Sequence, residues 1–274
     1  MIIHYDKPGQ LSNRIWSVLP SIAYGLEHKE KVLLINFDEY LDPFENLNKN
    51  NLIHFASRKL LRKFFFSLKV RGYIQNGRSN IFRKYLNLNL IEGWSNRLGN
   101  QQMIVNQSNI IRDIFQFKKS TTKEVDQLFD DFTNDYTLVG VHIRRGDYRE
   151  WLNGKYYYSD AEYLSILIDI DKQLKLKGQK AKFLLCSNEK LNIHNFSDLD
   201  YFIIENSSGV KDLYALSRCS YMIGPPSSYS QWASFIGKVP LKFIMNKDDK
   251  IALLDFSIIV SFNKFDNGNE LFID

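Results

Sequence analysis

The sequence predicts an α/β fold in which most strands run parallel. Short apolar runs alternate with segments of helical spacing along most of the 274 residues, and this alternation is typical of strands joined by crossover helices. The chain is 44% hydrophobic and 14% aromatic, which is enough to fill a core. The alternation is clearest between residues 137 and 245, where successive βα units predict a nucleotide-binding half.

The first half of the chain begins with a clear βαβ pattern. We expect a strand at Ile2–Tyr5, a turn at Pro8–Gly9 and a helix at Asn13–His28, in which apolar residues recur every three or four positions. Pro20 lies inside this helix, where a proline can bend the axis. A strong second strand is expected at Lys31–Phe37.

The next segment gives a weaker pattern. Residues 38–90 are rich in Asn, Phe, Lys and Arg, and we expect helices and loops there rather than sheet. A short strand at Ile91–Trp94 and helices at Arg97–Phe117 and Thr121–Phe132 follow. The polar stretch that starts at Lys118 indicates a domain boundary within 118–136, and we divide the chain into 1–130 and 131–274.

The second half of the chain gives the more regular pattern. The expected elements are, in order, a strand at Thr137–Ile143, a helix at Asp160–Leu176, strands at Phe183–Cys186 and Tyr201–Ile204, a helix at Val210–Ser217, a strand at Cys219–Ile223, a helix at Ser228–Ile236 and a strand at Leu241–Met245. In an open sheet of this kind, ligands bind beyond the carboxyl ends of the strands.

Composition excludes several classes of protein. The formal net charge of +5 is too small to indicate a nucleic-acid partner by itself. Cys186 and Cys219 lie in apolar contexts, so no disulfide framework is implied. The five histidines and two cysteines lack metal-ligand spacing. Because there is no signal peptide and no apolar run of about 20 residues, we expect a soluble, cytoplasmic chain.

Two arginines follow the buried strand that ends at Ile143. Arg144 and Arg145 precede a glycine that allows a sharp turn, and paired guanidiniums bind phosphate through parallel hydrogen bonds. By strand alternation His142 and Arg144 should point the same way and Arg145 the other way. We therefore expect Arg144 to bind phosphate and Arg145 to support it, although a strand histidine such as His142 is usually structural.

A second anion-binding feature follows the strand that ends at Ile223. Gly224 and two prolines end the strand, and Ser227 and Ser228 stand at the start of a helix whose free N–H groups favour anions. The alternative is that one serine is an ordinary N-cap. Because this helix start pairs with a second anion-friendly strand end, we favour phosphate binding.

Two polar positions are expected near the same crevice. Asp212 begins a helix, where a carboxylate can cap the helix or accept two hydrogen bonds from a guanine edge. Ser187 follows another strand, and its alternative is a plain polar turn. The basic stretch Arg58–Arg71 is expected to be either a solvated cationic helix with apolar residues packed inside or a peripheral contact with the inner face of a membrane.

The chain resembles a known family at several of these positions. His142–Tyr148 is similar to the His-x-Arg-Arg-Gly-Asp-Tyr signature of the α-1,2-fucosyltransferases, glycosyltransferase family 11, as found in bacteria. Further similar segments occur in the family's order: Gly9–Asn13, Ile111–Phe117, Asp212–Cys219 and Ser227–Ala233. The resemblance extends over roughly residues 1–245.

The resemblance implies a GT-B architecture of two Rossmann-like domains with a cleft between them. It implies GDP-fucose as the donor substrate, inversion at the anomeric carbon and no metal or other cofactor. The domain 1–130 would face the acceptor, which would be an oligosaccharide or a lipid-linked glycan, and the domain 131–274 would bind GDP. The implied reaction transfers fucose to a sugar hydroxyl, α-1,2 to galactose, in surface polysaccharide synthesis.

The resemblance also implies a role for each matching residue. Arg144 would hold the β-phosphate, with His142 and Arg145 shaping its site. The pyrophosphate would lie against Ser227, Ser228 and Tyr229, while Asp212 would contact the guanosine and Asn13 would lie near the fucose or the attacking hydroxyl. Asp147 is a candidate base that could equally brace the arginine loop. The alternatives are another donor or linkage on the same fold, or a non-catalytic nucleotide-sugar-binding protein.

Overall fold

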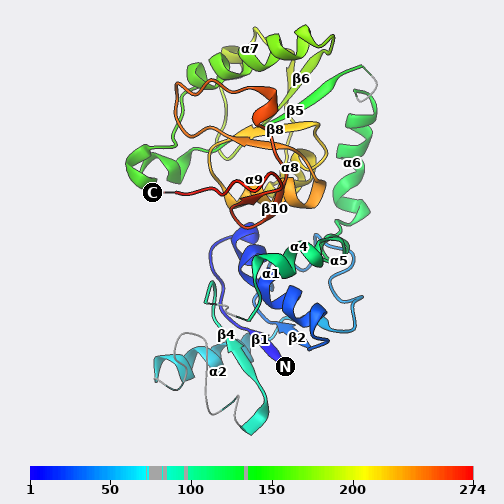
Figure 1. Ribbon diagram of the computed structural model, residues 1–274, viewed down its shortest axis with the longest axis vertical. Helices are drawn as coiled ribbons and strands as arrows, with labels where there is room; N and C mark the ends of the chain where they lie inside the picture. The colour runs from blue at the N-terminus through cyan, green and yellow to red at the C-terminus, as the bar shows by residue number, and fades with distance from the viewer. Residues whose placement is uncertain (72, 74–81, 83–84, 96–97, 133–134, 274) are drawn as a thin grey trace. The chain divides into compact units, whose positions relative to one another are not determined.

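The computed structural model describes the chain except for residues 72, 74–81, 83–84, 96–97, 133–134 and 274. It divides into two compact units, Met1–Lys118 with Val260–Phe262, and Lys119–Ile259 with Asn263–Asp274 (Figure 1). The division falls before helix α6 (Lys119–Asp130) rather than at residue 130. The reason is that α6 packs within the second unit, where Asp126 accepts a hydrogen bond from Tyr214.

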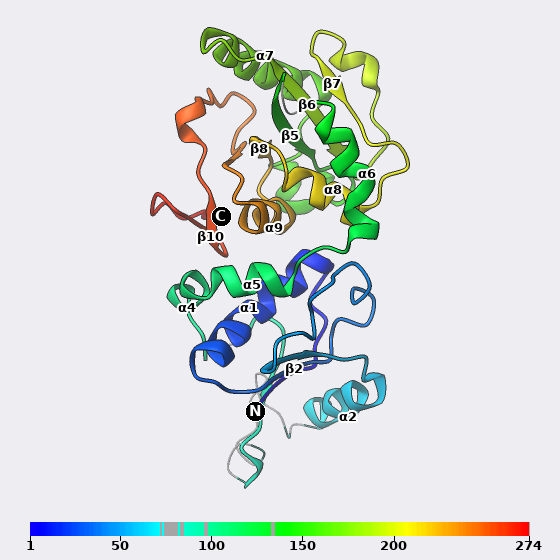
Figure 2. The ribbon, with the colours of Figure 1, turned by 90° about the vertical axis from the view of Figure 1, so that its right-hand side faces the viewer.

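The first unit is built on a parallel sheet with strand order β3-β2-β1-β4. Its strands are β1 (Ile2–His4), β2 (Val32–Leu34), β3 (Ile53–Phe55) and β4 (Asn89–Ile91). Its named helices are α1 (Leu11–Glu27), α2 (Lys59–Val70), α4 (Gln101–Asn106) and α5 (Ser108–Ile114). Helices α1, α4 and α5 lie on one side of this sheet and α2 on the other (Figure 2).

Alternation along β1 explains these two layers. Ile3 and Tyr5 pack with Phe65 of α2, whereas the intervening His4 faces α1 and hydrogen-bonds Ser21 over 2.6 Å between Nε2 and Oγ. Successive side chains of a strand point to opposite faces. The side chains of β1 and Tyr5 therefore contact helices on both faces of the sheet.

Three expectations for the first unit need correction. Residues 38–90 do contribute sheet, because β3 and the first two residues of β4 lie there. These strands have three residues each, too few for a periodic pattern to show. The strand expected at Ile91–Trp94 lies at Asn89–Ile91 instead. The expected helix Arg97–Phe117 is two helices that meet at Gln107, and its predicted first residue lies outside the described residues.

The second unit contains a five-stranded sheet of order β7-β6-β5-β8-β9, and the pairings between these strands are parallel. Its strands are β5 (Thr137–Ile143), β6 (Ala181–Ser187), β7 (Tyr201–Phe202), β8 (Tyr221–Gly224) and β9 (Leu241–Phe243). Besides α6, its helices are α7 (Asp160–Leu176), α8 (Gly209–Leu216) and α9 (Ser228–Gly237). Both units therefore confirm the predicted α/β fold with mainly parallel sheets.

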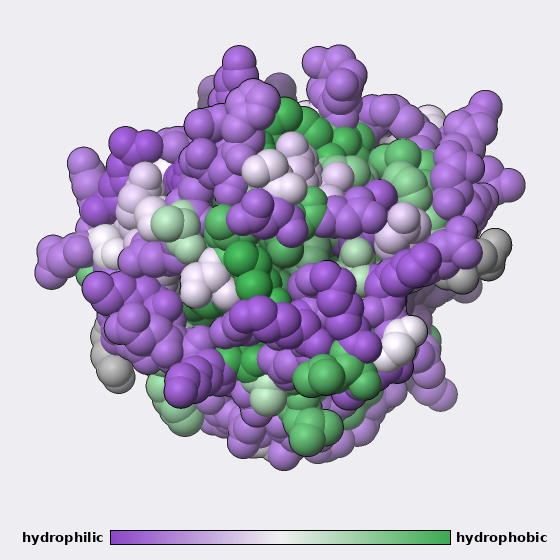
Figure 3. Space-filling view, turned by 90° about the horizontal axis from the view of Figure 1, so that it is seen from above, coloured by the Kyte–Doolittle hydropathy of each residue, from purple (hydrophilic) through white to green (hydrophobic). Residues whose placement is uncertain are grey.

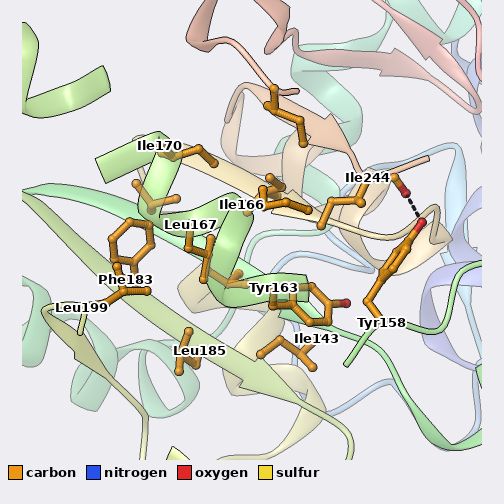
Figure 4. Packing of buried hydrophobic residues seen from close by; sticks show 14 of the residues in the cluster. Ile143, Tyr158, Tyr163, Ile166, Leu167, Ile170, Phe183, Leu185, Leu199 and Ile244 are labelled. Atoms are coloured by element: carbon orange, nitrogen blue, oxygen red, sulfur yellow. Dashed lines mark hydrogen bonds between the residues drawn. The ribbon is translucent and has the colours of Figure 1, made fainter. Parts of the chain in front are cut away.

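The two faces of β5 carry different helices. Val139, Val141 and Ile143 pack with buried residues of α7 in one core (Figure 4). On the other face Gly140 lies so close to α8 that a Cβ there would stand 2.7 Å from a methyl carbon of Leu216. Helix α7 begins with a capping box, in which Ser159 and Glu162 each bind the other's backbone N–H. These local signals explain why the predicted bounds of β5 and α7 agree with the structure.

The C-terminal part of the chain returns briefly to the first unit. Strand β10 (Ile259–Ser261) pairs with β11 (Lys264–Phe265), and residues Val260–Phe262 belong to the first unit. There the Phe262 ring lies 5.7 Å from Trp16 and 4.9 Å from Trp94, centroid to centroid. The first unit is thus completed by residues distant in sequence.

The face shown in Figure 3 is dominated by hydrophilic residues, with smaller groups of hydrophobic residues between them. Among the described residues, no helix combines the length and the apolar character needed to cross a membrane.

Candidate active site

Arg145 is held inside the second unit at the carboxyl end of β5. Its guanidinium pairs with Asp160 in the first turn of α7, and both side chains are largely buried. Its backbone N–H donates to Asn188 Oδ1 at 2.8 Å, and Asn188 Nδ2 donates back to its carbonyl at 3.2 Å. Gly146 then takes a left-handed conformation with φ of +60°. Arg145 therefore anchors the loop, and its guanidinium is occupied by a carboxylate.

Arg144 is the more available of the two arginines. Its guanidinium lies 2.9 Å from Asp147 three residues later, and the Asp147 side chain is 62% exposed. Exposed ion pairs of this kind contribute only about 0–1 kcal/mol. An anionic ligand can therefore compete with Asp147 for Arg144 at little energetic cost.

Tyr148 links the arginine loop to the start of α9. The Arg144 guanidinium lies over the Tyr148 ring, 5.6 Å from its centroid. The Tyr148 hydroxyl donates a 2.5 Å hydrogen bond to the carbonyl of Pro226 in the turn before α9. Burial raises the pKa of Tyr148 to about 12, which keeps the hydroxyl protonated for this bond. The two anion-friendly features predicted from the sequence are thus tied together within one unit.

The start of α9 has the form expected of an anion site. Ser227 is its N-cap and accepts a 3.1 Å hydrogen bond from the Tyr229 N–H, so the capping role weighed for the serines is present. Ser227 and Ser228 are partly exposed. The remaining N–H groups of the first helical turn carry the partial positive charge of the helix. Capping by Ser227 leaves that charge in place for a ligand.

His142 is a buried, neutral support beneath this site. Its Nδ1 lies 2.7 Å from Ser230 Oγ, and its ring lies 5.0 Å from the Tyr229 ring. Burial, with a smaller contribution from Arg144, lowers the pKa of His142 from 6.5 to about 3. Gly224 makes this packing feasible, because a Cβ there would lie 2.6 Å from the His142 carbonyl oxygen.

Asp212 faces the same region from the first turn of α8. The helix-capping alternative for this residue is wrong, because Ser208 caps α8 by accepting from the Lys211 N–H. Asp212 instead accepts hydrogen bonds from Ser207 and from the thiol of Cys186 at the end of β6. Burial raises the pKa of Asp212, and these two hydrogen bonds oppose that rise.

Two further contacts complete this end of the sheet. The Tyr229 hydroxyl donates a 2.6 Å hydrogen bond to the Gly209 carbonyl, which joins the starts of α9 and α8. Ser187 accepts a 3.2 Å hydrogen bond from the Glu189 N–H, so the polar-turn alternative for Ser187 is present. The second unit therefore brings together the site residues predicted within it: His142, Arg144, Arg145, Asp147, Ser187, Asp212, Ser227, Ser228 and Tyr229.

Asn13 belongs to the first unit, and its role stays a prediction. It lies in the first turn of α1, where a Cβ on Gly9 would stand 2.5 Å from Asn13 Nδ2. Gly9 has a φ of +57°, so a side chain would be strained there as well as crowded. The neighbouring Arg14, to which sequence reasoning gave no role, fixes this turn by donating to the Gly9 and Asn36 carbonyls.

Sequence reasoning missed the residues that hold the site together. Tyr148 stood in the quoted motif without a role, and Asp160, Cys186 and Ser230 act through contacts across strands and helices. Asn188 lies in the polar turn after the predicted strand Phe183–Cys186, which sequence reasoning placed near the same crevice, but its hydrogen bonds to Arg145 were not predicted. Among the described residues, no group of three or more His, Cys, Asp or Glu side chains is arranged to hold a metal ion.

The comparison with protein families identifies the chain. The family model described as "Glycosyl transferase family 11" matches residues 11–249. The chain belongs to glycosyl transferase family 11. No match was found among curated protein sequences.

Solved structures show that this family 11 chain has the GT-B-like fold of several fucosyltransferases. NodZ, an α-1,6-fucosyltransferase, soaked with GDP-fucose matches with a TM-score of 0.56 at 15% identity, over 88% of this chain and 93% of that one; a NodZ structure comes from Bradyrhizobium. POFUT1 in complex with GDP-fucose gives a TM-score of 0.55 at 10% identity, over 89% and 97%. A mutant of Arabidopsis thaliana FUT1 in complex with GDP gives 0.61 at 10% identity, over 98% and 78%.

Proposed function

We propose that the chain transfers fucose from GDP-fucose to a galactose hydroxyl with α-1,2 linkage, as a cytoplasmic, bacterial-type enzyme of surface polysaccharide synthesis. The observation that carries this proposal is the hydrogen bond from Tyr148 to Pro226. This bond holds the loop that carries Arg144 against the turn before α9. Two anion-binding groups, the Arg144 guanidinium and the first N–H groups of α9, therefore lie at the same end of the sheet. Family membership and the GDP or GDP-fucose bound in the similar structures support the choice of donor.

In the proposed reaction Arg144 leaves Asp147 and binds the β-phosphate of the donor. The acceptor oxygen attacks the anomeric carbon of fucose and loses its proton, while the bond to the β-phosphate oxygen breaks and its electron pair leaves with GDP. Arg144 and the α9 N–H groups stabilise the charge that develops on this oxygen, as preorganised donors do in other enzymes. This charge stabilisation lets the reaction proceed without a metal ion.

The other predicted residues have supporting roles in this proposal. Ser227, Ser228 and Tyr229 bind the pyrophosphate, and Asp212 binds the guanosine. His142 and Arg145 hold Arg144 in position through their buried contacts. Once released from Arg144, Asp147 is the candidate base, and Asn13 lies near the fucose or the attacking hydroxyl.

Nucleotide selectivity tests the donor assignment. In calorimetry without added metal we expect GDP to bind at least about tenfold more tightly than ADP or UDP, a difference of about 1.4 kcal/mol. The variant Asp212→Asn should lose most of this preference, because its side chain no longer accepts two hydrogen bonds from guanine. Equal affinity for the three nucleotides would contradict the proposal. Hydrolysis of GDP-fucose by the wild type then separates an enzyme from a binding protein.

Helix α2 carries our second proposal, a peripheral contact with an anionic membrane surface. The expectation that its apolar residues pack inside holds for Leu61, Phe65 and Leu68, but Leu60 is 83% exposed and Val70 is 72% exposed. Phe64 and Phe66 are more than half exposed too. Cationic helices with exposed apolar residues adsorb to anionic lipid. A lipid-linked acceptor would make such a contact useful.

Vesicle co-sedimentation tests this contact. The wild type should bind vesicles that contain phosphatidylserine and not vesicles of phosphatidylcholine alone. Reversing the charge of Arg58 and Lys59 to glutamate should lower binding by about thirtyfold or more, since each basic residue near such a surface contributes about 1 kcal/mol. The matched control reverses the exposed Lys177 and Lys180 in the second unit. A similar loss in both double variants would indicate a general charge effect and contradict the proposal.

A further inference from the structure

The first unit contains a pocket of about 310 Å³ between the end of β1 and α2. It is lined by Tyr5, Asp6, Lys7, Arg62, Lys63 and Phe66. Three of these residues directly follow β1, and the others lie on α2. The carboxyl end of a parallel strand is where ligands of open α/β sheets bind. The volume is near the lower end of ligand pockets, which span about 300–1,000 Å³, and suits one or two sugar rings.

Tyr5 lines this pocket and is almost completely buried. Its ring is only 1% exposed and lies 5.7 Å from Phe65, centroid to centroid. Its hydroxyl has no hydrogen-bond partner among the described residues. Leaving a buried hydroxyl unpaired costs about 1–3 kcal/mol, so proteins rarely do so without a reason. Burial raises the pKa of Tyr5, which keeps the hydroxyl available as a donor.

Lys7 and Arg62, two of the three cations that line the pocket, are paired with carboxylates. The Asp38 side chain is 6% exposed and lies 3.1 Å from Lys7 Nζ and 3.4 Å from Arg62 Nη1. Lys7 also pairs with Glu39 at 2.6 Å. Cations neutralised in this way can still donate hydrogen bonds, but they attract a phosphate less strongly than unpaired ones do. With Asp6 as an acceptor in the wall, the lining matches a ligand rich in neutral hydroxyl groups.

Phe66 supplies the apolar surface that a sugar also needs. Its side chain is on α2, is 55% exposed and lines the pocket. The axial 4-hydroxyl of galactose leaves one face of the ring as a continuous patch of C–H groups, which packs against an aromatic ring. An open aromatic ring beside hydroxyl-binding side chains therefore favours a galactoside.

We propose that this pocket binds the terminal galactoside of the acceptor, through the Tyr5 hydroxyl, the neighbouring charged side chains and the ring of Phe66. The inference rests on the proposed function and deepens it, because it assigns the acceptor sugar to named residues of the first unit. It makes Tyr5 and Phe66 determinants of acceptor affinity with no part in binding GDP.

Steady-state kinetics with lactose as the acceptor and saturating GDP-fucose test the proposal. Tyr5→Phe and Phe66→Ala should each raise the KM for lactose about tenfold, as expected when one hydrogen bond or one stacked ring is lost. Phe64→Ala is the matched control, because Phe64 is similarly exposed on the same helix without lining the pocket. Its KM should stay at the wild-type value, and all three variants should bind GDP normally.

The outcomes separate this inference from the proposed function. A Tyr5→Phe protein that melts at the wild-type temperature is expected, since the hydroxyl it lacks has no described partner. If Tyr5→Phe and Phe66→Ala keep the wild-type KM for lactose, the pocket assignment is overturned. A wild type that hydrolyses GDP-fucose but neither binds nor fucosylates lactose overturns it as well and leaves the donor chemistry standing. If the wild type does not bind GDP, the proposed function itself is contradicted.

Discussion

Replacing Arg144 with alanine is expected to lower kcat for fucose transfer by about 10²–10³-fold, the range seen when one preorganised donor to a developing oxyanion is removed. GDP affinity should fall as well, because the same guanidinium binds the β-phosphate in the ground state. The melting temperature should stay almost unchanged, since the Asp147 carboxylate left without its partner is 62% exposed and can be solvated by water. Transfer rates, GDP calorimetry and thermal unfolding on one preparation check all three parts.

Two other arginines of the same loop sharpen this test. Arg149→Ala is the matched control, because its guanidinium is 59% exposed and pairs with Glu189 at 2.9 Å. It should keep near-wild-type kcat. Arg145→Ala should instead unfold at a lower temperature, because the largely buried Asp160 carboxylate loses its cationic partner and keeps only the hydrogen bond from Asn195. If Arg144→Ala retains more than about a tenth of the wild-type kcat, the oxyanion role known from other enzymes does not apply here.

The second large effect expected is a loss of stability in mild acid. Burial lowers the pKa values of His4 and His142 from 6.5 to about 3 in the folded protein. Between these values the unfolded chain binds more protons than the folded chain, so the free energy of unfolding falls as the pH falls. The stability from the two neutral rings is fully present above pH 6.5 and is lost towards pH 3. The total loss is expected to be several kcal/mol, because a tenfold change in a proton-binding constant corresponds to about 1.4 kcal/mol.

Urea unfolding at a series of pH values measures this effect. The double variant His4→Gln, His142→Asn replaces both rings with neutral amides that can reach Ser21 and Ser230. It should be less stable than the wild type near pH 7 yet lose less stability on acidification. Substitution of the exposed His194 provides the control and should leave the slope unchanged. Equal slopes for the wild type and the double variant would show that other groups cause the acid response.

Local signals account for the parts of the fold that could be predicted. Strand β5 is a seven-residue buried run, and α7 is preceded by a serine with a glutamate three residues later; both have the predicted bounds. Strand β3 could not be predicted, because its three residues are stabilised by pairing with β2 rather than by any pattern of their own. Long-range pairing decides short strands, and a single sequence does not display it.

The candidate site, too, could be predicted only in part. Alternation along a strand separated Arg144 from Arg145, and the structure gives the two guanidiniums different carboxylate partners. The contact between Tyr148 and Pro226 joins residues 78 positions apart, and nothing in the local sequence of either residue points to the other. The kinds of side chain that form the site could therefore be predicted from the sequence, but the hydrogen bonds that hold them together could not.

The return of residues 260–262 to the first unit bears on how this protein could be recombined with its relatives. A gene fragment cut after Lys118 encodes both tryptophans but omits Phe262, the ring that lies against them. A chimera that takes its first unit from one parent and everything after it from another would therefore pair tryptophans and phenylalanine of different ancestry. Exchange of one whole unit in such a chain needs three crossovers, after residues 118, 259 and 262, so inheritance of the two units is coupled.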